Sequence, residues 1–128
     1  MSTTAVETLI ADYFAATRAM DGKAWVATFA EDAVVHDPVD QVPMKGHKQI
    51  GQFFQNITGL FDKVGLQENF VQITANEVAV KWTGQGVGKN GTEVTFEGID
   101  IFEVNDTGKI QTLRGYWNPT AMIAKLQS

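Results

Sequence analysis

Asp100 is an acidic residue at an apolar position of a predicted strand. Residues around it alternate between apolar and polar, and side chains in a strand have period two, so Asp100 shares a face with Phe96 and Phe102. Burial there would disfavour the charged carboxylate and raise its pKa. A carboxyl group that stays protonated near neutral pH can donate a hydrogen bond. The residues also leave open that Asp100 faces a solvent-filled gap, caps a bulge beside Gly98, or pairs with Arg114.

Two other residues have side chains that could act together with Asp100. Tyr13 lies on the apolar stripe of a predicted first helix, and Asp37 ends a short strand just before Pro38. Two carboxyl groups in different surroundings can be separated into a base and an acid. We expect Asp37, near the mouth of a cleft, to stay ionised and accept a proton, and Asp100, deeper, to stay protonated. Tyr13 and Asp100 would then donate to one oxygen as an oxyanion hole, which suits proton abstraction next to a carbonyl group.

Both of these partners also have a plainer structural interpretation. Tyr13 could be a core tyrosine whose hydroxyl donates to a backbone carbonyl. Asp37 could be a turn residue that forms a hydrogen bond with its own backbone. The sequence leaves these alternatives open, because neither residue is diagnostic alone.

The first half of the chain predicts three helices and one short strand. Thr3 or Thr4 would cap the first helix, with Glu7 completing a capping box, and Asp21-Gly22 would end it. Its inward side chains recur at spacings of three and four residues: Val6, Leu9, Ile10, Tyr13, Phe14 and Met20. The other expected elements are a short helix burying Trp25, Val26 and Phe29, a strand at 33–36, and a helix from Gly46 or His47 burying Ile50, Phe53, Phe54 and Ile57.

The second half is rich in β-branched and aromatic residues and in turn signals, which indicates antiparallel strands. We predict strands at about 64–74, 77–87, 92–104 and 109–118. Asn90-Gly91 is a favourable two-residue hairpin turn, and residues 119–126 could form a short helix. Helices followed by antiparallel strands indicate an α+β domain, in which a curved sheet wraps a helix and leaves a cleft.

Composition limits the classes of function. The 128 residues suit a single domain, 1–128, and a net charge of -5 argues against binding to nucleic acid or to an anionic membrane. There is no cysteine, and the two histidines, His36 and His47, have no carboxylate at metal-ligand spacing. We therefore expect no metal and no cofactor. Since neither a secretory signal nor an apolar run of membrane-spanning length is evident, we expect a cytoplasmic protein.

Three stretches carry a resemblance to a known family. They are Phe29-Ala30-Glu31-Asp32-Ala33-Val34-Val35-His36-Asp37-Pro38-Val39 with the later Pro43 and Gly46, Tyr13-Phe14-Ala15-Ala16, and Gly98-Ile99-Asp100-Ile101-Phe102 before Gly108-Lys109-Ile110. In order and spacing, over about residues 5–126, the chain resembles the ketosteroid isomerases of the nuclear transport factor 2-like (SnoaL-like) superfamily. The resemblance implies a cone-shaped α+β fold, with three N-terminal helices packed on a curved mixed or antiparallel sheet, and a homodimer.

The resemblance also implies roles for the three candidate residues. In that family a tyrosine and a protonated aspartate form the oxyanion hole, and an aspartate before proline is the base. This makes Tyr13, Asp100 and Asp37 the expected catalytic residues. The isomerases support their tyrosine with a second tyrosine on the third helix, and the matching position here is Phe54. Asp100 or Tyr116 would then have to orient Tyr13.

Together these observations predict a cofactor-independent isomerase that moves a double bond in a flat apolar ketone. The expected substrate-binding residues are Phe54, Phe102, Tyr116 and Trp117. One alternative is a polyketide cyclase or lyase that uses the same acid and base on another carbonyl compound. The other is a non-catalytic module that binds a small apolar ligand.

Overall fold

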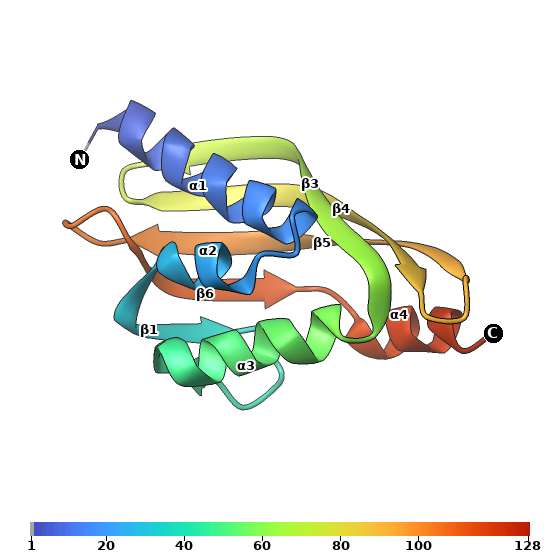
Figure 1. Ribbon diagram of the computed structural model, residues 1–128. Coiled ribbons are helices and arrows are strands. Elements are labelled where there is room, and N and C mark those ends of the chain that lie inside the picture. Colours follow the sequence, from blue (N-terminus) through green and yellow to red (C-terminus); the bar gives the residue numbers. More distant parts are fainter. Residues whose placement is uncertain (1) are drawn as a thin grey trace.

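The computed structural model describes residues 2–128, in which four helices lie on and beside one sheet of six strands (Figure 1). The elements are α1 Thr3–Arg18, α2 Gly22–Ala27, β1 Phe29–His36, β2 Met44–Lys45, α3 Gly46–Thr58, β3 Phe61–Thr74, β4 Glu77–Gly88, β5 Glu93–Val104, β6 Ile110–Tyr116 and α4 Pro119–Leu126. The first three helices cover one face of the sheet, and α4 lies at the end of the sheet beside the β4–β5 hairpin.

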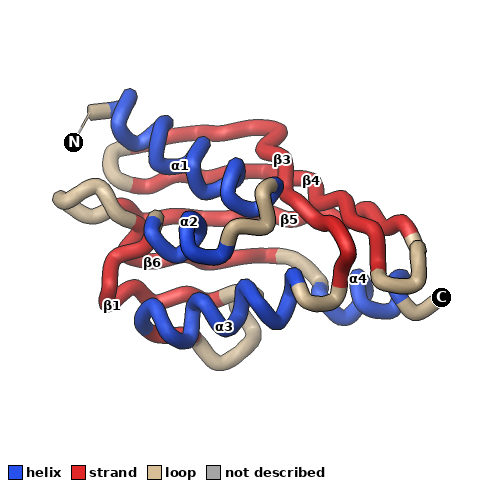
Figure 2. Tube along the Cα trace, in the orientation of Figure 1, coloured by secondary structure: helices blue, strands red, loops and turns tan. Residues whose placement is uncertain are grey.

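The sheet is mixed, in the order β2-β1-β6-β5-β4-β3. Strands β1 and β6 are parallel, and all other neighbours are antiparallel. The α+β fold and the mixed sheet agree with the sequence prediction. The expected arrangement of three N-terminal helices is not confirmed, because α3 follows the first two strands and a fourth helix closes the chain (Figure 2).

The first helix forms as its apolar stripe predicts, but its ends differ from the prediction. Ser2, not Thr3 or Thr4, is the N-cap, and its hydroxyl accepts a hydrogen bond from the amide of Ala5 at 3.1 Å. The left-handed residue after the helix is Met20, with φ of 52°. Asp21 caps α2 instead of ending α1, because its carboxylate accepts from the amide of Ala24 at 3.0 Å.

Three further boundaries correct the sequence prediction. Phe29 belongs to β1, where it pairs with Ile110, and not to the second helix. The β4–β5 connection spans residues 89–92 and is closed by a bond from the amide of Gly88 to the carbonyl of Thr92, so Asn90-Gly91 is not a two-residue turn. Strand β6 ends at Tyr116, which leaves Trp117 in the loop beyond it.

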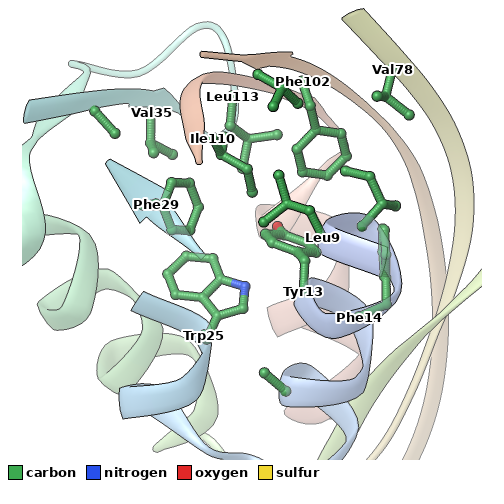
Figure 3. Packing of buried hydrophobic residues seen from close by; sticks show 14 of the residues in the cluster. Leu9, Tyr13, Phe14, Trp25, Phe29, Val35, Val78, Phe102, Ile110 and Leu113 are labelled. Carbon is green, nitrogen blue, oxygen red and sulfur yellow. The ribbon is translucent and has the colours of Figure 1, made fainter. Parts of the chain in front are cut away.

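An aromatic core fills the space between the helices and the sheet (Figure 3). Tyr13 of α1 packs edge-on against Phe102 of β5, with ring centroids 4.9 Å apart, and lies beside Trp25 of α2. Along β5 the inward residues Val94, Gly98, Asp100, Phe102 and Val104 are buried, as the period-two pattern predicts. Asp100 is therefore a polar group inside this core. Within residues 2–128, no helix is long and apolar enough to cross a membrane.

Candidate active site

The carboxyl group of Asp100 lies in the middle of β5 and is buried, with 2% of the residue exposed. Its strand pairs regularly here, with Val80 on one side and Gly115 on the other, so no bulge surrounds it. Arg114 pairs with Glu77 at 3.7 Å and is not the partner of Asp100. The buried interpretation of Asp100 is confirmed, and the solvent-gap, bulge and arginine alternatives do not hold.

The second carboxyl group, that of Asp37, is brought beside Asp100 by the parallel pairing of β1 with β6. The register that pairs His36 with Arg114 places the next residue, Asp37, next to Gly115. A Cβ atom at Gly115 would overlap Oδ1 of Asp37 and would lie 3.3 Å from Oδ1 of Asp100. Both carboxyl groups therefore converge on the space that Gly115 leaves free.

Trp117 fixes the orientation of the Asp37 side chain. Its indole N–H donates to Oδ1 of Asp37 at 2.6 Å, across 80 positions of sequence. The bond is short, as expected when an ionised acceptor shares in it. The backbone amide of Val39 donates to the carbonyl of Gly115 at 3.0 Å, which ties the segment after Asp37 to β6.

Tyr13 and the two carboxyl groups line one cavity of about 70 Å³ between the helices and the sheet. Its walls come from α1, α2, α3, the inner face of the sheet and the loops that follow β1 and β6: Tyr13, Thr17, Trp25, Asp37, Phe53, Phe54, Ile57, Thr58, Val64, Gly65, Leu66, Trp82, Phe96, Asp100 and Trp117. A larger and more open hollow of about 840 Å³ along β3–β5 contains none of the three candidate residues. The three candidate residues therefore share the small apolar cavity.

The surroundings of the carboxyl groups change their affinity for protons. Burial raises the pKa of Asp37 from 3.8 to about 7, and the indole donor of Trp117 opposes the rise. Burial, and then the neighbouring charge of Asp37, raise the pKa of Asp100 well above its ordinary value, while the nearby N–H group of Trp82 and hydroxyl group of Tyr13 oppose the rise. At neutral pH Asp100 is the protonated partner, as expected. Asp37 is half protonated near pH 7, so the expectation that it stays fully ionised is wrong.

Tyr13 keeps its proton throughout the physiological range. Burial, followed by the nearby carboxyl groups of Asp100 and Asp37, raises the pKa of Tyr13 well above its ordinary value. Its hydroxyl and the protonated Asp100 are thus two donors in the same cavity as a base. This arrangement can transfer a proton and stabilise negative charge on one oxygen.

The other expected site residues divide into two groups. Phe54 and Trp117 line the cavity. Phe102 is fully buried behind Tyr13 and supports it without reaching the cavity, whereas Tyr116 is 45% exposed and lies outside. Tyr116 therefore cannot orient Tyr13, because it follows the inward-facing Gly115 on β6 and points to the opposite face of the sheet. Within residues 2–128 no group of three or more His, Cys, Asp and Glu side chains could hold a metal ion.

Three residues of the site were not predicted from the sequence to take part in it. Gly115 leaves the space that the carboxyl groups fill, and the ring nitrogens of Trp25 and Trp82 are buried without a hydrogen-bond partner. Sequence alone supplies a weak signal for each: a glycine within a strand often marks a close approach, and a buried indole usually finds a partner.

The raised carboxyl pKa values predict how stability changes with pH. Between the unfolded value near 4 and the folded value, the native state holds protons that the unfolded chain has lost, so stability falls as pH rises. Asp100→Asn removes this dependence for one group. The unfolding free energy of Asp100→Asn relative to wild type should rise by about 1.4 kcal/mol per pH unit between pH 5 and 7, measured by urea denaturation. A difference that stays constant with pH would contradict burial of a titrating Asp100; Asp106→Asn, on an exposed turn, is the control.

Comparisons with known proteins agree with this fold. A family model of the SnoaL-like domain matches residues 10–113. The chain is 26% identical over 121 residues to a protein named Steroid Delta-isomerase from Nocardioides simplex. The aligned region covers 92% of this chain and 94% of that protein.

Two solved structures share the fold. One is a hypothetical protein with a ketosteroid isomerase-like fold from Catenulispora acidiphila, with TM-score 0.82, 16% identity and coverage of 93% of this chain and 92% of that one. The other is SalBIII, an epoxide hydrolase/cyclase-like enzyme in pyran ring formation of the polyether salinomycin, with TM-score 0.80, 24% identity and coverage of 90% and 92%. At these identities the two structures establish similarity of fold. Because the family model spans most of the chain, the protein belongs to the SnoaL-like domain family, within the nuclear transport factor 2-like superfamily that includes ketosteroid isomerase-like proteins.

Proposed function

We propose that this protein is a cofactor-independent isomerase that moves a carbon–carbon double bond in an apolar ketone. The family and its relatives support a small-molecule-converting enzyme. The observation that carries the finer proposal is the pair of carboxyl groups that converge at Gly115 with different proton affinities, beside the hydroxyl of Tyr13.

The proposed reaction is a proton transfer in two steps. Ionised Asp37 removes a proton from the carbon between the carbonyl group and the double bond, and the electron pair moves onto the carbonyl oxygen to give a dienolate. Tyr13 and protonated Asp100 donate hydrogen bonds to that oxygen as it becomes negative. Asp37 then returns the same proton to the far carbon of the former double bond, and the electron pair returns to form the conjugated enone. No oxidant, reductant or water is consumed.

The size of the cavity constrains the substrate. A volume of about 70 Å³ is well below the roughly 300–1,000 Å³ of pockets that hold drug-sized ligands. A flat ring system can enter if the aromatic wall on α3, formed by Phe53 and Phe54, swings outward. Of the two, Phe53 is the more exposed. A compact cyclic ketone needs less of this movement than a four-ring steroid, and both belong in the first assay.

The direct test mixes the protein with a β,γ-unsaturated ketone and follows the ultraviolet absorbance of the conjugated enone product, which absorbs strongly. Asp37→Asn should lower kcat/KM by about 100-fold or more, because a positioned general base contributes roughly 10²–10⁴-fold. The same substitution at Asp40, an exposed acid three residues away, is the control. In wild type, kcat/KM should rise with pH and reach half of its maximum near pH 7, the pKa of Asp37. Loss of less than tenfold in Asp37→Asn would contradict its role as the base.

Gly115 supplies a second test of the same geometry. In Gly115→Ala the new Cβ would occupy the position of Oδ1 of Asp37 and push the base out of place. We expect kcat/KM to fall by about 100-fold, since a misplacement of the order of 1 Å can have that effect. We also expect the pH profile to move to lower pH, because the displaced carboxyl group gains water.

Gly51→Ala is the matched control for Gly115→Ala. A Cβ at Gly51, on α3, would make only an ordinary contact of 3.4 Å with Val26. This variant should keep kcat/KM within about twofold of wild type. Wild-type kinetics in Gly115→Ala would mean that the two carboxyl groups do not need the space above this glycine.

A second candidate function follows from the closeness of the two carboxyl groups. An acid and a base that meet at one point can also protonate an epoxide oxygen from Asp100 while Asp37 removes the proton of an attacking hydroxyl group. The likeness in fold to SalBIII favours this alternative over other cyclase chemistry. Ring closure of a hydroxy-epoxide, followed by product analysis, separates it from isomerisation.

The expected homodimer stays a prediction, and one surface suits it. Phe70, Lys81, Ile99 and Tyr116 pair in a row across four strands. Phe70, Ile99 and Tyr116 are 62%, 44% and 45% exposed, an unusual run of large apolar side chains on an open face.

A further inference from the structure

Two tryptophans in the cavity have polar atoms with no partner. Among residues 2–128, the buried side-chain nitrogen and oxygen atoms without a hydrogen bond are Nε1 of Trp25 and Nε1 of Trp82. Each residue is 2% exposed. A buried donor without a partner is unfavourable, because it has given up its hydrogen bonds to water and gained none. An unsatisfied buried donor in a native structure calls for an explanation, and a role in function is one of them.

Both indole groups lie next to the two donors of the proposed oxyanion hole. Trp25 has its ring centroid 5.6 Å from that of Tyr13, and Figure 3 shows its ring nitrogen on the edge that faces Tyr13. Trp82 lies on β4 opposite Gly98, one inward position from Asp100 on the neighbouring strand. Both line the cavity. Each N–H group favours the more negative form of its neighbour, Trp25 that of Tyr13 and Trp82 that of Asp100.

We propose that Trp25 and Trp82 are positioning residues that complete the oxyanion hole: the N–H group of Trp25 closes onto the hydroxyl oxygen of Tyr13, and that of Trp82 onto the carbonyl oxygen of protonated Asp100. This inference rests on the oxyanion hole of the proposed function. A donor on the oxygen of Tyr13 makes its O–H group a stronger donor, because linked hydrogen bonds polarise one another. A donor on the carbonyl oxygen of Asp100 leaves its O–H group to face the ligand.

Trp25 occupies the place where support for Tyr13 is otherwise missing. Phe54 on α3 has no hydroxyl group, and Tyr116 is outside the cavity. The ring of Phe54 packs on that of Trp25, with centroids 4.8 Å apart and an angle of 33° between the planes. The indole is thus held against the tyrosine by an apolar neighbour, and its N–H group is the side-chain donor beside Tyr13 from α2.

The test measures binding of an aromatic oxyanion, which needs no turnover. The probe is 4-nitrophenolate, and nitrobenzene is its neutral counterpart. Trp25→Phe keeps an aromatic ring and removes the N–H group, so it should weaken binding of 4-nitrophenolate relative to nitrobenzene by about two- to tenfold, the usual effect of one hydrogen bond to a neutral group such as the hydroxyl of Tyr13. Phe70→Leu changes an aromatic side chain on the open face of the sheet, outside the cavity, and should leave this ratio unchanged.

A double variant separates a lost donor from a damaged core. Trp25→Phe combined with Phe54→Tyr returns a hydroxyl group from α3 and should recover most of the lost ratio. A purely structural defect would not respond in this way. Thermal unfolding of each variant establishes that the folded protein is the one being titrated.

The three tryptophans also allow a direct observation by NMR. Their indole groups give three resonances in a proton–nitrogen correlation spectrum, and that of Trp117 is already hydrogen-bonded to Asp37. Addition of 4-nitrophenolate should move the proton resonances of Trp25 and Trp82 downfield, since their N–H groups acquire partners. Single Trp→Phe variants assign the three signals.

Three results would overturn the inference. They are an unchanged binding ratio in Trp25→Phe, unmoved indole resonances in a saturated complex, and no binding of 4-nitrophenolate to wild type at millimolar concentration. The ligand 4-nitrocatechol carries a second oxygen. If Trp25→Phe weakened the binding of 4-nitrocatechol but not that of 4-nitrophenolate, the indole groups would bind the ligand directly and would not act through Tyr13 and Asp100. If the protein passes these tests but isomerises no ketone, the isomerase proposal is wrong. The inference that Trp25 and Trp82 support the donors Tyr13 and Asp100 would still hold.

Discussion

Desolvation of two carboxyl groups in one apolar cavity is the constraint on which the site depends. Each charged group would lose its water there, and each raises the cost of ionising the other. Burial is the larger cause for both, and the charge of Asp37 adds to the effect at Asp100. The hydrogen bond from Trp117 opposes the rise in the pKa of Asp37, whereas the charge of Asp37 raises the pKa of Asp100 further. This difference separates a base from an acid.

The sheet makes this convergence possible through its one parallel pair. Strand β1 enters beside β6, and the register carries Asp37 to Gly115 at the point where β5 presents Asp100. The missing side chain at Gly115 provides the space, and the aromatic residues of α1, α2 and α3 exclude water from it. A site of this kind reduces stability at neutral pH, because the native state must hold protons that the unfolded chain releases. The surrounding aromatic core offsets that cost.

The period-two pattern around Asp100 predicted its burial, since strand geometry is local and the neighbouring residues are strongly apolar. The partners of Asp100 were harder to find. The convergence at Gly115 depends on a pairing between residues about 80 positions apart, which no local pattern encodes. The expectation of an ionised Asp37 failed because burial in the cavity raises the pKa of its carboxyl group to about 7. At the start of α1, Ser2 and two threonines compete as caps, and the difference between them is too small for sequence to decide.

The measurement that tests the central claim most directly is a carboxyl NMR titration of protein labelled with ¹³C at the aspartate side chains, with Asp37 and Asp100 assigned from their Asn variants. The signal of Asp37 should change with a midpoint near pH 7, and that of Asp100 should stay at the position of a protonated carboxyl group well above it. Midpoints near the ordinary value of about 4 for both groups would mean that water reaches the cavity. Such a result would contradict the separation of acid and base from which the proposed chemistry follows.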